Sequence, residues 1–280
     1  MKRFWKLFIL LAVVLSLVGC GLPGEPTQPA GNLEVHFIDV GQADCMLVSC
    51  GGRYMLIDGG NVEDGSLVVS YLLQQGVQEL EAVVCTHPHE DHAGGLAAVL
   101  AVFPTNRVYG SSKTYSSRAY NNFLKYVYQQ GLEVAIPSPG DRWSMGGCEV
   151  TVLGPVKTYA DINNTSIVLR VDYGDTSFLF TGDMEQDAEQ DLLDSGANVR
   201  ADVLKVGHHG SYTSTGYRLL YEAQPKYGVI CVGKGNDYGH PHKEPLSRLE
   251  DAYVQLYRTD TMGTVIITSD GETLTVQTQR

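Results

Sequence analysis

Apolar runs of strand length alternate along the chain with stretches whose apolar residues recur at helical spacing. The short runs predict strands over 33–40, 43–49, 53–58, 82–85, 107–109, 148–153, 165–173, 176–181, 203–206, 227–232, 264–269 and 273–277. Helices are expected over 67–75, 95–102, 120–130, 185–195 and 245–253. Hairpins come first, strand–helix alternation follows, and this order occurs twice. The pattern predicts an α/β fold with two mixed sheets face to face and helices outside.

The first twenty residues have a different pattern. Lys2, Arg3 and Lys6 precede an apolar run over 7–18. This run is shorter than the roughly 20 apolar residues that a spanning helix needs, and its layout is that of an export signal. The ending Leu17-Val18-Gly19-Cys20 resembles the lipobox of bacterial lipoproteins, which implies cleavage before Cys20 and a lipid on its sulfur. A plain cleaved signal and an uncleaved anchor are the alternatives.

Residues 21–32 are rich in proline and glycine and predict a tether, and residues 33–280 are long enough for one domain. We therefore expect a domain held by a lipid anchor at the extracytoplasmic face of a bacterial cell membrane. The net charge of −12 disfavours non-specific binding to nucleic acid. Beyond Cys20, no cysteines stand in a CxxC pair, although Cys45 and Cys50 could form a disulfide. Nothing indicates a stable protein partner.

The segment 86–95 (THPHEDHAGG) carries the clearest chemical signal. It places three histidines and two carboxylates within six positions, directly after an apolar strand. Imidazole and carboxylate ligands together suit zinc, manganese, iron or nickel. Loops at strand ends are where layered α/β proteins present functional groups. The segment therefore predicts a metal site.

Three later strand ends carry further polar groups: Gly182-Asp183, the run 207–211 (GHHGS) and the run 235–242 (GNDYGHPH). Taken alone, Asp183 would be read as a helix cap. However, seven of the eight histidines lie in just three strand-end loops, and His36 is the exception, on a predicted strand face. Such a concentration favours a single site assembled from distant loops.

The pattern of these residues resembles that of the metallo-β-lactamase fold superfamily. Its members fold as an αββα four-layer sandwich and bind one or two metals. The signature is His87-x-His89-x-Asp91-His92. More narrowly, the chain is similar to the extracytoplasmic hydrolase domain of the competence protein ComEC. The matching segments are 36–44, 56–60, 86–95, 163–169, 181–183, 204–211 and 239–241. They occur in family order and cover almost the whole domain.

The resemblance implies a ligand set. His87 and His89 would hold one divalent metal, Asp91 and His92 a second, and Asp183 would bridge them. His240 is the expected last ligand, with His208 and His209 as proton donors or phosphate contacts. In the competing assignment, either His208 or His209 is the last metal ligand. His240 then contacts the ligands without binding the metal itself. Asp58 would orient a ligand imidazole, and further residues around the ligands or substrate would be Asp44, Asn163, Asn164, Lys205, Ser211 and His242.

Two departures from the family pattern stand out. The usual third histidine of the first metal appears as Asn163 or Asn164, so manganese is as suitable here as zinc. Ala43 and Cys45 stand where ComEC-like members commonly have glycine and serine. This departure affects the expected substrate contact there and leaves the metal ligands unchanged.

The implied activity is metal-assisted hydrolysis, with Asp91 or Asp183 orienting a hydroxide and His208 and His209 stabilising developing charge. DNA or a small phosphodiester is the favoured substrate. The alternatives are hydrolysis of small esters or lactones, and a non-catalytic, metal-stabilised binding lipoprotein. A nuclease would show a basic or aromatic groove, for which Lys113, Arg118, Lys125 and Lys205 are candidates. A small-molecule enzyme would show a closed pocket under the tyrosine-rich stretch 115–128.

Overall fold

The computed structural model describes residues 31–280. The predicted signal 1–20, the lipid-attachment residue Cys20 and most of the tether 21–32 lie outside the described residues. Within the described part, no helix combines the length and apolar character needed to cross a membrane.

The first sheet has eight strands in the order β15-β14-β1-β2-β3-β4-β5-β6. Strands β15 to β3 pair antiparallel, and β3 to β6 pair parallel. The last two strands of the chain therefore extend the sheet beside its first strand. The bounds are β1 (Leu33–Phe37), β2 (Met46–Cys50), β3 (Arg53–Ile57), β4 (Ala82–Cys85), β5 (Val108–Gly110), β6 (Val134–Ala135), β14 (Val265–Ser269) and β15 (Leu274–Thr278).

The second sheet has seven strands in the order β13-β12-β11-β10-β9-β8-β7. Strands β7 to β10 pair antiparallel, and β10 to β13 pair parallel. The bounds are β7 (Arg142–Met145), β8 (Cys148–Gly154), β9 (Val168–Tyr173), β10 (Thr176–Phe180), β11 (Val203–Lys205), β12 (Tyr227–Ile230) and β13 (Gln255–Arg258).

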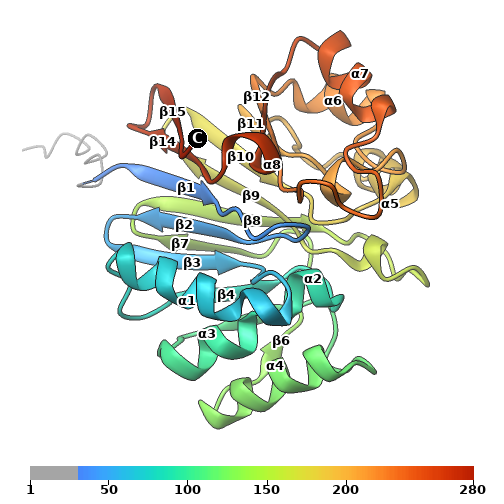
Figure 1. The fold of residues 1–280 in the computed structure, drawn as a ribbon. Coiled ribbons are helices and arrows are strands. Elements are labelled where there is room, and N and C mark those ends of the chain that lie inside the picture. Colours follow the sequence, from blue (N-terminus) through green and yellow to red (C-terminus); the bar gives the residue numbers. More distant parts are fainter. Residues whose placement is uncertain (1–30) are drawn as a thin grey trace, which may run out of the picture.

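The helices lie outside the two sheets (Figure 1). On the first sheet they are α1 (Gly65–Gln74), α2 (Glu90–Ala93), α3 (Leu96–Val102) and α4 (Arg118–Gln129). On the second sheet they are α5 (Gln186–Asp194), α6 (Tyr217–Ala223), α7 (Lys243–Asp251) and the short α8 (Thr259–Met262). The structure thus confirms the predicted four-layer αββα sandwich.

Alternation along the strands produces three cores. In β1, Val35 and Phe37 face the core between the sheets, whereas Leu47 and Leu56 of the neighbouring strands face α1 and α3. A third core lies between the second sheet and helices α5 to α7. Because successive side chains of a strand point to opposite faces, each sheet needs apolar cover on both sides. His36 lies on the outer face, where its Nδ1 is 2.8 Å from the Tyr71 hydroxyl.

The structure differs from the predicted elements mainly at edges and ends. Edge strands β6, β7 and β13 and the short helices α2, α6 and α8 were not predicted. The residues of β13 are at most partly buried, so the apolar alternation that marks an inner strand is weak there. Strand β9 begins at Val168, later than predicted, because Asn163–Thr165 form a 3-10 turn.

Candidate metal centre

Loops from both sheets converge at one end of the sandwich. The histidine loop follows β4 of the first sheet, and Asp183 follows β10 of the second. Strands β10, β11 and β12 are parallel neighbours, so the loops after them share one edge of that sheet. This arrangement brings residues from distant parts of the sequence together.

Four side chains from these loops form a compact cluster, three of them buried and Asp91 partly exposed: Asp91, His92, Asp183 and His209. The Asp183 carboxylate lies at its middle, with Oδ2 at 3.2 Å from His92 Nε2 and 3.6 Å from His209 Nε2. Asp91 Oδ2 lies 3.2 Å from His209 Nε2 and 3.9 Å from His92 Nε2. Two imidazoles and two carboxylates thus point their donor atoms into one space.

Asp58 fixes the orientation of His92. It occupies the loop after β3 with a left-handed backbone (φ 58°). Its Oδ1 accepts from the Thr86 amide at 2.7 Å, and its Oδ2 accepts from the Thr86 hydroxyl at 2.7 Å and lies 2.8 Å from His92 Nδ1. With Nδ1 protonated and held by a carboxylate, the Nε2 lone pair of His92 is directed at the cluster.

His209 is oriented in an equivalent way from the other sheet. Its Nδ1 donates to the Cys231 carbonyl at 2.9 Å, which leaves Nε2 facing Asp91 and Asp183. Its backbone is left-handed (φ 51°), and a hydrogen bond from the amide of His208 to the Gly182 carbonyl holds this turn against the Asp183 loop. Although burial opposes it, the nearby carboxylates of Asp183 and Asp44 raise the pKa of His209 to about 10.

The structure places His209, and not the expected His240, among the cluster's donor atoms. The His240 ring centroid lies 6.3 Å from that of His209, and His240 forms part of a cavity wall. The reason is strand order: β11 is adjacent to β10, so the loop after β11 lies nearer Asp183 than the loop after β12. Burial and its histidine neighbours lower the pKa of His240 to about 4.

Three further histidines lie around the Asp183 carboxylate, and the His87 ring centroid is 4.0 Å from that of His92. His87 Nε2 is 3.1 Å from His89 Nδ1 and 3.9 Å from Asp183 Oδ2. His208 Nε2 lies 3.7 Å from the same oxygen, while its Nδ1 is 3.2 Å from Glu185 Oε1. Burial and the neighbouring His92 lower the pKa of His87 well below its usual value, which keeps this imidazole neutral.

The two asparagines have different surroundings. Asn164 is buried, and its side-chain oxygen accepts from the Glu185 amide at 2.9 Å, which ties the 3-10 turn to the start of α5. Asn163 lines the cavity above the cluster, and its buried Oδ1 has no hydrogen-bond partner among the described residues. Asn163 is therefore the one in a position to meet a ligand.

Lys205 was a candidate either for a basic groove or for a position behind the ligands, and it occupies a position of the second kind. It is fully buried, and its Nζ lies 2.7 Å from Asp44 Oδ2 and donates to the Val206 carbonyl at 2.9 Å. Asp44 in turn lies 3.3 Å from His209 Nδ1 and 3.9 Å from His92 Nδ1. Asp44 raises the pKa of Lys205 against the opposing effect of burial, so a permanent cation lies beneath the cluster.

The cluster fits a divalent metal. His92 Nε2 and Asp183 Oδ1 are buried and have no hydrogen-bond partner among residues 31–280. Buried polar atoms without partners are costly, and histidine nitrogens with carboxylate oxygens are the donor set that zinc and manganese accept. The residues that would hold one ion are Asp91, His92, Asp183 and His209. His87 and His89 with Asp183 offer a second, less complete set.

A cavity of about 660 Å³ opens over this cluster. Its walls include amides, carboxylates and rings: Gln42, Asn61, Glu63, Glu90, Asn163, Tyr238 and His240. Among the described residues, its lining includes no lysine or arginine. Tyr238 is 68 % exposed and stacks on His240, with ring centroids 5.6 Å apart. The cavity therefore has an aromatic wall but no basic one.

Some wall residues were not predicted from the sequence. Gln42 lies in a predicted segment, yet only the structure shows it joining two loops, with Oε1 accepting from the Gly233 amide at 3.1 Å.

Ser211 is buried, 2.9 Å from the Thr213 hydroxyl, and His242 Nδ1 accepts from the Tyr212 amide at 3.1 Å. Both were predicted to lie around the ligands or substrate, and both lie outside the cluster and outside the cavity lining.

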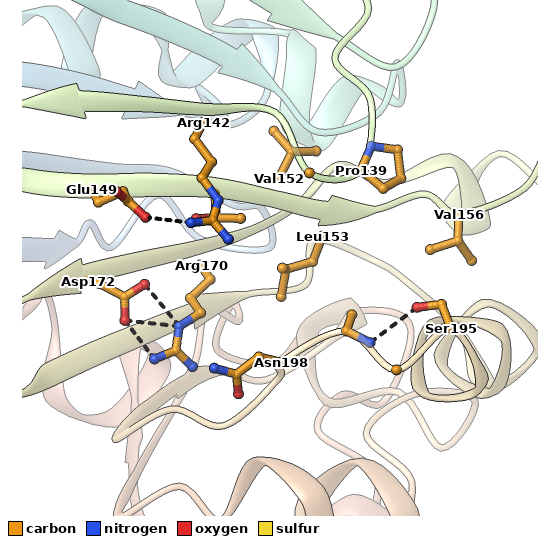
Figure 2. Close-up of a pocket in the computed structure, with 14 residues that line it drawn as sticks. Pro139, Arg142, Glu149, Val152, Leu153, Val156, Arg170, Asp172, Ser195 and Asn198 are labelled. Atoms are coloured by element: carbon orange, nitrogen blue, oxygen red, sulfur yellow. Dashed lines mark hydrogen bonds and ion pairs between the residues drawn. The ribbon is translucent and has the colours of Figure 1, made fainter.

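A second cavity, of about 630 Å³, lies on the outer face of the second sheet (Figure 2). Its two guanidinium groups are each neutralised by a carboxylate. Arg170 forms a forked pair with Asp172 at 2.6–2.9 Å, and Arg142 lies 3.3 Å from Glu149. No histidine lines it, so the chemistry-bearing residues of the described chain gather in the cavity over the cluster.

Comparison with known proteins agrees with this architecture. The family model described as the metallo-beta-lactamase superfamily matches residues 38–234. The chain is 32% identical over 251 residues to ComE operon protein 3 of Bacillus subtilis (strain 168), covering 83% of this chain and 32% of that protein. It is 31% identical over 253 residues to competence protein ComA of Neisseria gonorrhoeae, covering 89% of this chain and 34% of that one.

The chain thus spans about a third of the length of these curated relatives. Among solved structures, the metallo-beta-lactamase fold protein YhfI from Bacillus subtilis matches with a TM-score of 0.55 and 14% identity, covering 88% of this chain and all of that one (100%). At that identity the likeness concerns the fold alone. The matched family model, the competence-protein relatives and the shared fold establish that the chain belongs to the metallo-β-lactamase superfamily.

Proposed function

We propose that this chain is a metal-dependent hydrolase of phosphodiesters. The observation that carries the proposal is the cluster of Asp91, His92, Asp183 and His209 at the floor of an open cavity. Both of its imidazoles are held by hydrogen bonds at Nδ1, so that Nε2 points inward. Preorganised donors of this kind, beneath a space large enough for a substrate, are typical of hydrolytic metal centres.

One or two divalent ions, zinc or manganese, would supply an acidified water and charge stabilisation at this site. The protein's own groups provide orientation and proton transfer. Asp91 and Asp183 both belong to the cluster and line the cavity, but the Asp91 side chain is 29 % exposed and that of Asp183 only 2 %, so Asp91 is the carboxylate better placed to align the attacking oxygen. His208 lines the same cavity, and contacts from Nδ1 to Glu185 and Thr213 fix its ring. It is suited to donate a proton to the leaving oxygen.

The cavity wall bears on the choice of substrate. Exposed rings such as Tyr238 can stack against an aromatic part of a substrate, such as a nucleobase. The relatives named as competence proteins support DNA as a candidate. Glu63 and Glu90 on the wall, and a lining without lysine or arginine, favour a substrate with few phosphates near the centre. A short phosphodiester or a nucleic-acid end satisfies both conditions.

The lack of lysine and arginine in the described lining also supports a second candidate, hydrolysis of small esters or lactones. Such substrates need metal activation but no basic groove. A non-catalytic lipoprotein that only binds metal is the third candidate. We further propose that the domain acts outside the cytoplasmic membrane on a lipid anchor at Cys20, because the first twenty residues have the layout of a lipoprotein signal.

The deciding experiment couples metal analysis to turnover. Metal content per chain would be measured by mass spectrometry, and hydrolysis of bis(p-nitrophenyl) phosphate would be compared for the wild type and Asp91→Asn. Asp175→Asn is the matched control, because Asp175 is exposed in the turn before β10, away from the cluster. Bound metal with activity lost only in Asp91→Asn supports the phosphodiesterase. Metal without turnover would direct the assay to esters and lactones, and absence of metal would refute the proposal.

A further inference from the structure

The described chain contains five free cysteines, all buried: Cys45, Cys50, Cys85, Cys148 and Cys231. Two of them face the same core from opposite sheets. Cys50 ends β2 of the first sheet and Cys148 begins β8 of the second, and both belong to the core between the sheets. Cys45, which the sequence offered as a partner for Cys50, belongs to the outer core beneath the helices. The sheet therefore separates Cys45 from Cys50.

The two sheets converge where Cys50 and Cys148 lie. Packed sheets are usually about 10 Å apart, whereas the Cα atoms of a disulfide are about 4.4–6.8 Å apart, so most facing positions cannot be bridged. Here the hairpin turns touch. A Cβ atom on Gly146 would lie 1.7 Å from the Cys50 carbonyl oxygen, and one on Gly51 would lie 2.2 Å from the Gly146 carbonyl oxygen. The absence of side chains at both glycines permits this approach.

The thiol groups lie at the contact between the two turns. The Cys50 thiol donates to the Gly146 carbonyl at 3.3 Å, and the Cys148 thiol donates to the Met145 carbonyl at 3.0 Å. The two acceptor carbonyls belong to consecutive residues, so both thiols lie against the same turn between β7 and β8.

We propose that Cys50 and Cys148 form a disulfide that links the two sheets when the chain folds in the presence of a small-molecule disulfide oxidant. One of the two cysteine thiolates attacks the oxidant, forms a mixed disulfide and releases one small thiolate. The other cysteine thiolate then attacks the protein sulfur of that mixed disulfide and releases the second. Two protein thiols are oxidised to one disulfide, their two protons pass to the released thiolates, and the oxidant is reduced to two small thiols. The step takes place before the sheets close, because both sulfurs are buried afterwards.

This bridge would act at the end of the sandwich opposite the metal centre. Cys50 pairs with Arg53 in the register of β2 and β3, whereas the other end of β3 leads to Asp58. Figure 1 shows the turn between β2 and β3 far from α2 and the histidine loop. The bridge would close a loop of roughly 100 residues, and a long loop constrains the unfolded state more strongly than a short one. The proposal does not depend on the hydrolytic activity, and disulfides persist in the extracytoplasmic compartments in which we place the domain.

The test uses the full-length chain, unfolded in denaturant and refolded with reduced and oxidised glutathione. Remaining thiols would be alkylated, the protein digested and the linked peptides identified by mass spectrometry. A peptide joining Cys50 to Cys148 is expected. The melting temperature of the oxidised protein should fall by roughly 5–15 °C on treatment with dithiothreitol. Cys148→Ala should abolish this shift, and Cys45→Ala should retain it.

The wild-type peptide map decides the question even if Cys148→Ala does not fold. Recovery of Cys50 in alkylated form from well-folded, oxidised protein would overturn the proposal. A link between Cys50 and any other cysteine would overturn it as well. Loss of the dithiothreitol-dependent shift in Cys45→Ala, with the shift kept in Cys148→Ala, would assign the redox effect to a different pair.

Discussion

Asp58 and His92 form a buried pair in which the carboxylate holds Nδ1 of the imidazole at 2.8 Å. The same carboxylate accepts two hydrogen bonds from Thr86, so it cannot rotate away from the ring. Because the first sheet contributes Asp58 and the histidine loop from neighbouring parallel strands, this pair is fixed by the β3–β4 register. The direction of one candidate metal ligand is therefore built into the sheet.

Asp58→Asn should weaken metal binding without unfolding the domain. Asparagine tolerates the left-handed backbone at this position, but its amide cannot hold the His92 Nδ1–H as a carboxylate does. Loss of such an orienting carboxylate typically lowers metal affinity about 10–100-fold. The affinity would be measured by competition with a chromophoric chelator, with Asp175→Asn as control. An unchanged affinity in a folded Asp58→Asn would contradict this role.

His209→Asn and His240→Asn distinguish the two candidates for the last ligand. Asparagine suits the left-handed backbone of His209 but is too short to place a donor in the cluster. We expect His209→Asn to lower metal content and His240→Asn to retain it, with a change confined to the KM for substrate. Metal content per folded chain is the measurement. The reverse result would restore His240 as the ligand.

Tyr238→Ala should raise the KM for an aryl phosphodiester while leaving kcat close to the wild-type value. The exposed ring stacks on His240 at an interplanar angle of 21° and can extend that stack to a substrate ring. An aromatic contact of this kind corresponds to roughly a 2–10-fold change in KM. Tyr253→Ala is the matched control, because Tyr253 is 94 % exposed and follows α7, outside the cavity lining. Equal effects of the two substitutions would argue against stacking.

Lys205→Met should destabilise the fold strongly, since it leaves the buried Asp44 without its cation. Removal of one partner of a buried ion pair costs about 3–5 kcal/mol in the free energy of unfolding. Adding Asp44→Asn should recover part of this loss, because the uncompensated charge is then gone. Urea unfolding with a chelator present would separate this effect from metal binding. A double variant less stable than Lys205→Met would show that charge compensation is not the reason.

Glu189 should make stability depend on pH in a predictable direction. Burial raises its pKa to about 7 from a usual 4.5, although the amides of Thr215 and Gly216 donate to it. The folded protein thus binds this proton more tightly than the unfolded chain. Its stabilising effect is complete below pH 4.5 and is lost as the pH rises through 7, by up to about 3 kcal/mol.

Glu189→Gln removes this titration. The wild type should therefore lose stability relative to the variant between pH 5 and pH 8. The variant also carries a constant penalty, because its side-chain oxygen can serve only one of the two amides well. Urea unfolding of both proteins at the two pH values gives the difference. Parallel pH profiles would show that Glu189 does not carry a raised pKa.

Much of the fold could be predicted because inner strands and amphipathic helices leave a local pattern. Strand β10 and the segment 86–92 are recognisable without any knowledge of their neighbours. The choice between His209 and His240 is different, since it depends on which strands are adjacent in the second sheet. Both histidines follow apolar strands, and no local feature separates them.

The surroundings of Lys205 are a second feature that the sequence alone does not predict. The sequence left open whether Lys205 contacts the substrate or lies in a layer behind the ligands, and the structure places it behind them, with its Nζ 2.7 Å from Asp44 Oδ2. The alternation Val203, Leu204, Lys205 does place the lysine on the core face. Only the position of Asp44, from the other sheet, shows how its charge is compensated.

The candidate metal centre draws Asp91 and His92 from the first sheet's half of the chain and Asp183 and His209 from the second. A growing chain therefore has no full donor set until the ribosome has delivered β11 and the turn after it. Capture of an ion would be a late event that follows the meeting of the two halves. A product truncated before His209 would lack one of the four donors and should retain an ion poorly.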